Sequence, residues 1–316
     1  FSLQQTFAIN ATLNQSSLDH SLYVALKAKD AIVDQFRDET GDRPNVDIDY
    51  PDFRIHLHIY ENHCTLSFDS SGDSLHKRGY RDYTNQAPIN EALAAALVIQ
   101  SGWDKKLPLA DFMCGSGTIL VEAAMYALNI APNKFRSKFG FEGWKDFDAS
   151  LWKKVKNEAI AAELKPDGLT LYGGDISGVV LDKARQNIEE AGLTDVIRLK
   201  KSSFDKFPVP APNGVLICNP PYGLRIEPKD IMSMYQTMGD KMKHDFKGWT
   251  CWIFTGNLEV AKFIGLRPSR KIQLYNGPIE CRFLKFDVYE GSKKAKKNIE
   301  QDSESHLDNS ENSSSK

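Results

Sequence analysis

Segments that read as β-strands alternate with segments that read as helices between residues 89 and 254, and this alternation constrains the fold more than any other feature. The strand-like apolar runs are 107–112, 169–172, 196–199, 215–218 and 250–254. Stretches with helical apolar spacing lie before and between them, at 89–99, 119–128, 179–190 and 231–242. Such alternation predicts a parallel sheet. Asn276-Gly277 then predicts a hairpin that closes the sheet with antiparallel strands.

The rest of the chain differs from this α/β pattern. Near the N-terminus a helical stretch is followed by alternating polar and apolar residues at 46–49, 53–59 and 64–68, which predicts half-buried strands. The parts that we expect are an α+β module at 1–75, a linker at 76–88, an α/β domain at 89–290 with an insertion at 131–168, and a disordered tail at 291–316.

Composition excludes several classes of protein. The chain of 316 residues has a net charge of -2, so any nucleic-acid surface must be a local patch. No run of about 18 apolar residues occurs, and we expect neither a membrane span nor a secretion signal. The 5 cysteines contain no CxxC pair, which favours free thiols in a reducing compartment over disulfides or a zinc site. We therefore expect a monomeric cytoplasmic protein without a metal ion.

A glycine turn follows the first strand of the α/β domain. Asp111 stands at the end of this strand, and Cys114-Gly115-Ser116-Gly117-Thr118 leads into a helix whose first N–H groups can bind a ligand. Leu120 replaces the third glycine of a dinucleotide-binding loop. Asp175 ends the next strand, where a carboxylate can accept both hydroxyls of a ribose. Capping of the strand ends remains the alternative role for both aspartates.

The run Asn219-Pro220-Pro221-Tyr222-Gly223 follows the strand at 215–218. Proline cannot donate to a sheet ladder, so the two prolines must lie beyond the paired strand. Ligands bind at this carboxyl edge in open α/β sheets. An amide, rigid prolines and an aromatic ring there favour a grip on a planar exocyclic amine, whereas a turn that merely closes the strand is the alternative.

Together these motifs resemble a class I S-adenosylmethionine-dependent methyltransferase. The runs Arg78-Gly79-Tyr80-Arg81 and Ala87-Pro88-Ile89-Asn90-Glu91 make the chain most similar to the THUMP-containing RNA methyltransferases, in particular the bacterial 23S rRNA (guanine-N2) methyltransferases. The resemblance covers residues 1–290. It implies a Rossmann-like α/β fold with a mostly parallel seven-stranded sheet and a C-terminal antiparallel hairpin. A partial THUMP-like domain would precede it, and we expect the start of that domain to be missing.

The resemblance also implies which residues hold S-adenosylmethionine. Those around its methionine part are Asp111, Cys114, Gly115 and Gly117, and Thr118 and Asn219 would also bind the cofactor. Asp175 would hold the ribose, with Ile176 against the adenine. The residues that would cover the other side are Gln86, Pro88 and Asn90. Where the family often has an acid for the adenine amine, this chain has Ser202-Ser203-Phe204, so Ser203 or Asp205 would make that contact.

The implied reaction is methyl transfer to the N2 amine of a guanine in 23S rRNA or a large-subunit assembly intermediate. The catalytic residues would be Asn219, Pro220, Pro221 and Tyr222. The candidates for RNA contact are Arg78, Arg81, Lys134, Arg136, Lys138 and Arg225. For the basic and aromatic insertion, a packed helical cover remains the alternative. A methyltransferase for adenine N6 or protein glutamine, or a non-catalytic RNA-binding module, are the alternatives for the whole chain.

Overall fold

The computed structural model describes residues 1–81, 89–222 and 228–289, which form two units. The first unit contains residues 1–79 and 130–163, and the second contains residues 80–129 and the described residues from 164 onward. The segment 130–163 thus belongs to the first unit, although it lies in sequence between elements of the second. The tail expected at 291–316 lies outside the described residues.

A three-stranded sheet and one long helix build the first unit. The strands are β1 (Phe7–Asn14), β2 (Phe53–Tyr60) and β3 (His63–Phe68), with β1 parallel and β3 antiparallel to the central β2. Helix α1 (Ser21–Thr40) packs on β1 and ends at Gly41, which has a φ of +76°. Buried and partly exposed side chains alternate along β2, as the sequence predicts, and the core contains Phe7, Val33, Phe53 and Ile55.

The strand expected at 46–49 is not formed. Only Val46 makes an isolated bridge, to Phe7. Immediately afterwards, the Asp47 carboxylate accepts hydrogen bonds from the backbone N–H groups of Asp49 (3.0 Å) and Tyr50 (2.9 Å). Such a local turn competes with ladder pairing, because the same N–H groups cannot serve both.

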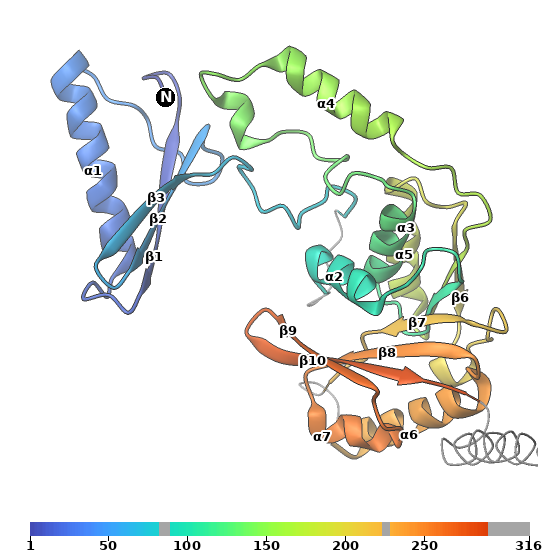
Figure 1. Cartoon of the computed structure of the whole chain (residues 1–316). Helices are drawn as coiled ribbons and strands as arrows, with labels where there is room; N and C mark the ends of the chain where they lie inside the picture. The colour runs from blue at the N-terminus through green and yellow to red at the C-terminus, as the bar shows by residue number, and fades with distance from the viewer. Residues whose placement is uncertain (82–88, 223–227, 290–316) are drawn as a thin grey trace, which may run out of the picture. The chain divides into compact units, whose positions relative to one another are not determined.

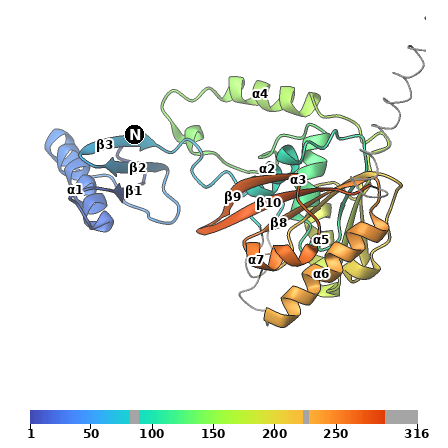
Figure 2. The same cartoon turned by 60° about the horizontal axis from the view of Figure 1, so that its bottom comes forward.

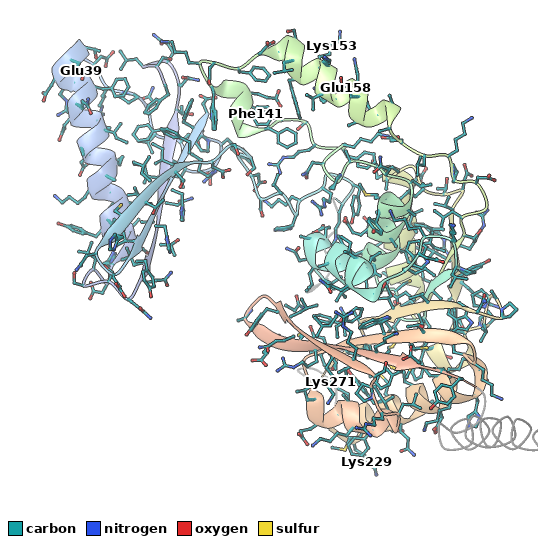
Figure 3. All side chains as sticks on the ribbon, viewed as in Figure 1. Glu39, Phe141, Lys153, Glu158, Lys229 and Lys271 are labelled. Atoms are coloured by element: carbon teal, nitrogen blue, oxygen red, sulfur yellow. The ribbon has the colours of Figure 1, made fainter. Side chains whose placement is uncertain are left out.

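The segment 130–163 carries a short 3₁₀ helix η1 (Gly140–Gly143) and helix α4 (Ala149–Ala161). Its aromatic rings pack around Phe141, which is labelled in Figure 3. Phe139 stacks on Phe141 at 5.4 Å, and Trp152 of α4 meets Phe141 edge-on at 5.0 Å. Backbone contact joins the segment to the loop after β3, since Phe141 N–H donates to the carbonyl of Ser70. These contacts favour the packed cover over an exposed stacking platform for these rings.

A seven-stranded sheet forms the centre of the second unit, in the order β6-β5-β4-β7-β8-β10-β9 (Figure 1). The strands are β4 (Leu109–Asp111), β5 (Leu171–Asp175), β6 (Ile197–Lys201), β7 (Gly214–Cys218), β8 (Trp249–Thr255), β9 (Arg270–Asn276) and β10 (Ile279–Asp287). The first five pair in parallel, whereas β10 pairs antiparallel with both β8 and β9. The predicted parallel sheet and closing hairpin are confirmed.

Helices cover both faces of this sheet. On one face lie α2 (Glu91–Ser101), α3 (Thr118–Ala127) and α5 (Gly178–Glu190), and on the other α6 (Pro228–Asp245) and α7 (Leu258–Ala261) (Figure 1). The short 3₁₀ helices η2 (Phe204–Lys206) and η3 (Lys262–Ile264) contact α6. Figure 2 shows the β9–β10 hairpin beside β8.

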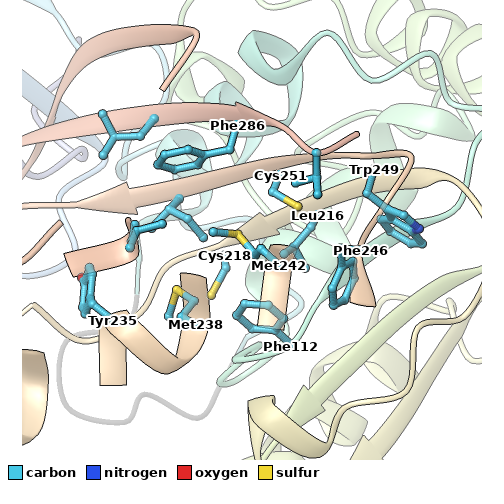
Figure 4. Close-up of a cluster of buried hydrophobic side chains, with 14 of the residues drawn as sticks. Phe112, Leu216, Cys218, Tyr235, Met238, Met242, Phe246, Trp249, Cys251 and Phe286 are labelled. Carbon is cyan, nitrogen blue, oxygen red and sulfur yellow. The ribbon is translucent and has the colours of Figure 1, made fainter. Parts of the chain in front are cut away.

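A large hydrophobic core of the second unit lies between the sheet and α6. Strand residues such as Leu216, Cys218 and Cys251 meet Met238 and Met242 of α6 there (Figure 4). All 5 cysteines are free thiols, and 4 of them are buried. Among the described helices none is long and apolar enough to cross a membrane. No group of three or more potential metal ligands occurs within the described part of the chain.

Candidate active site

Three neighbouring strands bring the predicted site residues to one edge of the sheet. Strand β4 ends at Asp111, β5 at Asp175, and β7 at the residue before Asn219. Because β4 pairs in parallel with both β5 and β7, these three ends meet at the carboxyl edge. Direct contacts tie the edge together, since Cys114 N–H donates to the carbonyl of Gly174 at 2.8 Å.

The glycine turn gives α3 an open N-terminus. Gly115 and Gly117 have φ values of +56° and +80°, which favour glycine. Gly117 is the N-cap of α3, and no side chain caps the first N–H groups of the helix. Those groups can therefore bind an acidic or polar ligand group. Thr118, in contrast, is buried, and its hydroxyl lies 3.3 Å from that of Ser116.

Asp175 is fixed by two backbone donors. Its carboxylate oxygens accept hydrogen bonds from Gly115 N–H (3.1 Å) and Ser177 N–H (2.9 Å). Each oxygen keeps a second lone pair for a hydroxyl of a bound ribose. The next residue, Ile176, has 71% of its surface exposed, although it is large and apolar. An exposed isoleucine beside a fixed carboxylate fits a ribose with an attached planar base.

Close packing explains why two glycines precede Asp175. A Cβ on Gly173 would come within 2.5 Å of Leu199 Cδ2, and one on Gly174 within 2.4 Å of Phe207 Cδ2. Real Cβ atoms do not approach other heavy atoms so closely. The glycines therefore allow the neighbouring side chains to fill the space behind the site.

Asp111 is a buried acid at the centre of the edge. It has 2% of its surface exposed, and it accepts a hydrogen bond from Met113 N–H at 3.0 Å. Its pKa is raised to about 8, mainly by burial and in smaller part by the Asp175 carboxylate. Burial likewise raises the pKa of the Cys114 and Cys218 thiols. Both thiols therefore stay protonated at neutral pH and are poor nucleophiles.

Asn219 presents an unsatisfied acceptor. Its side-chain oxygen Oδ1 is buried from solvent and accepts no hydrogen bond from any described residue. Buried polar atoms are almost always paired, so an unpaired one calls for an explanation. An amine N–H group of a bound substrate could donate a hydrogen bond to this oxygen.

Side chains that the sequence did not identify hold the rest of the motif in place. Asn276, at the end of β9, donates from Nδ2 to the Tyr222 hydroxyl at 2.6 Å. Gly256 lies under the same ring, because a Cβ there would stand 3.0 Å from Tyr222 Cδ2. The buried Tyr235 of α6 donates to the carbonyl of Pro221 at 3.4 Å and lies 2.9 Å from the Thr255 hydroxyl.

The sequence did contain signals for these residues. Thr255 and Gly256 follow a predicted strand at its carboxyl end, which is where ligand sites occur. The sequence indicates Asn276 as a hairpin residue, and a turn that starts with Asn-Gly can also place the asparagine amide against a neighbour. No pattern pointed to Tyr235, which is an ordinary apolar position of an amphipathic helix.

The remaining predicted cofactor residues have varied places. Gln86 and Pro88 lie outside the described residues. Asn90 caps α2, where its Oδ1 accepts from Ala92 N–H at 2.8 Å and Leu93 N–H at 3.3 Å. Ser203 and Asp205 stand beside the end of β5, because the adjoining Ser202 N–H donates to the carbonyl of Asp175 at 3.0 Å. A hydrogen bond from Ser203 lowers the pKa of Asp205.

The predicted RNA-contact residues differ in the exposure of their side chains and in the ion pairs and hydrogen bonds that those side chains already make. Arg81 is buried and forms an ion pair with the equally buried Glu91 at 2.9 Å. Arg78 is also buried and donates to the carbonyl of Leu75. Contact of either arginine with a phosphate would require these bonds to break.

Within the insertion, two of the three predicted cations make close bonds. Arg136 donates to the carbonyls of Ser71 (2.9 Å) and Asp73 (2.8 Å), and Lys134 pairs with Glu163 at 2.7 Å. Lys138 has 68% of its side chain exposed. Arg225 lies outside the described residues.

Two family models match the chain. The model described as RMKL-like, methyltransferase domain matches residues 78–285, and the THUMP domain model matches residues 1–69. The resemblance predicted from the motifs is thereby confirmed, and so is the two-part organisation of a THUMP domain ahead of a methyltransferase fold.

Curated relatives support the same assignment. The chain is 45% identical over 290 residues to slr0064 of Synechocystis sp., which is named as an RNA methyltransferase, with 92% of this chain and 76% of the relative covered. It is 40% identical over 298 residues to the ribosomal RNA large subunit methyltransferase K/L of Syntrophotalea carbinolica, with 90% of this chain covered. The chain spans only 42% of that relative, about two fifths of its length.

A solved structure shares the fold. SMU.472, described as a methyltransferase complexed with SAH, superposes with a TM-score of 0.82 at 32% identity, covering 92% of this chain and 77% of that one. SAH is S-adenosylhomocysteine, which remains when S-adenosylmethionine has given up its methyl group. The carboxyl edge built around Asp111 and Asp175, the two family matches and these relatives lead to one conclusion: the chain belongs to the RMKL-like methyltransferase family and carries a THUMP domain.

Proposed function

We propose that this protein transfers a methyl group from S-adenosylmethionine to the exocyclic N2 amine of a guanine in 23S rRNA. The observation that carries the proposal is the buried Asn219 Oδ1, which has no hydrogen-bond partner among the described residues. It lies directly beyond the end of β7, where an amide oxygen could accept a hydrogen bond from a planar amine. The K/L relatives are named for large-subunit ribosomal RNA, and a THUMP domain precedes the fold here as well.

The residues present fit the cofactor. The uncapped N-terminus of α3 suits its methionine part, the fixed Asp175 carboxylate suits its ribose, and the exposed Ile176 suits its adenine. When bound, S-adenosylmethionine supplies a methyl group on a cationic sulfonium. The neighbouring Asp111 compensates that positive charge when it is ionised.

Asn219 and Pro220 would activate the amine. The lone pair of the guanine N2 nitrogen is delocalised into the ring, which makes it a poor nucleophile. Asn219 Oδ1 and the carbonyl of Pro220 can each accept one of its N–H groups and so pull the nitrogen toward tetrahedral geometry. The nitrogen lone pair then becomes available for in-line attack, and the acceleration comes from orientation and electrostatics.

Tyr222 would hold the base. Stacking of a base on an aromatic ring contributes about 1–3 kcal/mol. The ring is half-buried, and Gly256 and Asn276 hold it from two sides. A paired guanine cannot reach this edge, so the target must be unpaired or flipped out of its helix. Naked 23S rRNA and a large-subunit assembly intermediate in the cytoplasm are both substrates of this kind.

Asn219→Ala tests the proposal. We expect methyl transfer from labelled S-adenosylmethionine to 23S rRNA to fall by about 100-fold or more, by analogy with the loss of about 2.7–4 kcal/mol when one oxyanion-hole donor is removed. Calorimetry should show S-adenosylhomocysteine binding within a few-fold of wild type. Asn213→Ala, at an exposed asparagine of the same unit, is the control and should leave the rate unchanged.

Mass spectrometry of the product nucleosides identifies the modified atom. The proposal requires N2-methylguanosine. N6-methyladenosine, methylation of protein glutamine instead of RNA, or near-wild-type transfer by Asn219→Ala would each contradict it.

A further inference from the structure

The second unit contains a pocket at the edge of the sheet opposite to the candidate active site. The pocket has a volume of about 700 Å³ and lies between the last turn of α6, the residues before β9 and the end of β10. Because β10 is antiparallel to β8, its end meets the start of β8, where Val288 N–H donates to the carbonyl of Trp249. The 7 residues of β8 separate the pocket from the carboxyl edge by about 20 Å.

The charge of this pocket is predominantly positive. Lys243, Lys247 and Arg267 line it, with Asp287 as the one acid of the lining. Asp287 is already compensated, since it accepts from the Ser269 hydroxyl at 2.7 Å and pairs with Lys285 at 2.9 Å. Lys243 likewise pairs with Asp240 at 3.2 Å, but such an exposed pair contributes little, so the lining keeps more positive than negative charge in a chain whose net charge is -2.

Only one of these three cations has a position where it would stabilise a helix. Cations in the last turn of a helix interact favourably with its dipole, and Lys243 stands there in α6. Arg267 lies on the loop before β9, and its side chain makes no ion pair or hydrogen bond to any residue that the structure describes. An exposed arginine that lines a hollow and has no partner among the described residues is available to an anion.

The lining of the pocket also contains apolar side chains. These are Leu266, Phe286 and Val288, and the partly exposed ring of Tyr289 lies beside them in the lining. Cations around an apolar, aromatic hollow match a strand that carries phosphates outside and sugars or bases inside. A merely solvated charged surface would need no hollow.

We propose that this pocket binds the sugar-phosphate backbone of the RNA substrate at a distance from the methylated base. The inference rests on the proposed function for the identity of the substrate, but it concerns a surface that takes no part in the chemistry. RNA held there would be anchored on the far edge of the same sheet that receives the target base.

The combined substitution Lys243→Gln, Lys247→Gln and Arg267→Gln tests this. Each phosphate contact to a single strand contributes a slope of about 0.7 to the dependence of log affinity on log salt. Binding of the full chain to protein-free 23S rRNA, followed by fluorescence anisotropy over a range of salt, should therefore lose about 2 units of slope. The control exchanges Lys106, Arg185 and Arg198 for Gln, which removes the same charge from exposed positions of the same unit outside the pocket.

Equal slopes for the pocket variant and the control variant would overturn the inference. A second result would also overturn it. Inorganic phosphate or guanosine monophosphate would raise the melting temperature of the wild-type protein, while the pocket variant would keep the wild-type salt slope for RNA binding. Arg267→Gln alone should lose about 0.7 units of slope with an unchanged melting temperature, which guards against a folding defect. Methyl transfer by the wild-type protein is measured separately, so failure of the proposed function and failure of the pocket give different results.

Discussion

At the scale of single residues, the candidate site contains buried polar groups that lack a hydrogen-bond partner or a neighbouring opposite charge. Asn219 Oδ1 lacks a partner among the described residues, and Asp111 is an acid with almost no exposure to water. Both conditions reduce stability, and both are useful only when a ligand brings the missing donor or the missing positive charge. The residues around them are therefore better tested through binding and catalysis than through stability alone.

Asn276 should act on catalysis through the Tyr222 hydroxyl. We expect Asn276→Ala to lower kcat/KM for RNA by about five- to tenfold, the effect of one lost hydrogen bond of about 1 kcal/mol. Steady-state methylation assays of Asn276→Ala, Tyr222→Phe and the double variant measure the coupling. In the Tyr222→Phe background, which lacks the hydroxyl, loss of Asn276 should have little further effect, and full additivity would refute the role. Gln273→Ala, an exposed position of the same hairpin, is the control.

Asp111 should make stability depend on pH. Its pKa is about 8 in the folded protein and near 4 in an unfolded chain, so the unfolded state loses the proton first as pH rises. The stability that the neutral acid contributes is complete below pH 4 and is lost as pH rises through 8. Relative to Asp111→Asn, the wild type should thus lose stability over this window, by several kcal/mol as an upper bound. Urea unfolding of both proteins from pH 4 to 9 measures it, and a constant difference would contradict the prediction.

At the scale of elements, one glycine sets how closely α6 approaches η3. Gly239 lies in α6, and a Cβ there would stand 1.8 Å from the carbonyl oxygen of Ile264 in η3. The same helix carries Tyr235, which supports the Pro221 carbonyl. The position of α6 therefore links the core to the motif.

Gly239→Ala should destabilise the protein although alanine favours helices. Propensity alone would predict a gain of about 1 kcal/mol, but the clash with Ile264 must displace α6 from η3. We expect a net loss of about 1–3 kcal/mol, in the range of overpacked cores, measured by urea unfolding. Ser233→Ala, on the exposed side of the same helix, should instead be neutral or slightly stabilising. A gain for Gly239→Ala would show that the close approach does not exist.

At the scale of the whole molecule, the sequence predicted architecture better than contacts. Alternating strands and helices, and the glycine turn before α3, follow local rules, so the parallel sheet and its carboxyl edge could be predicted. The contact of Asn276 with Tyr222 could not, because it depends on the β9–β10 hairpin lying beside β8. Charge was equally ambiguous: Arg81 and Lys138 look alike in sequence, yet one is buried in an ion pair and the other is exposed. The alternating pattern at 46–49 predicted a strand, but hydrogen bonds to the Asp47 carboxylate form a local turn there instead.

The first unit is completed by a segment that follows part of the second in the chain. Residues 130–163 come after β4 and α3, yet their backbone packs against the loop after β3, where a Cβ on Gly140 would stand 2.5 Å from the carbonyl oxygen of Asp69. During synthesis, residues 80–129, which include the glycine turn of the candidate site, are therefore produced between the two parts of the first unit. Domains generally fold as units, so the N-terminal residues of the first unit emerge from the ribosome well before the segment that completes their contacts.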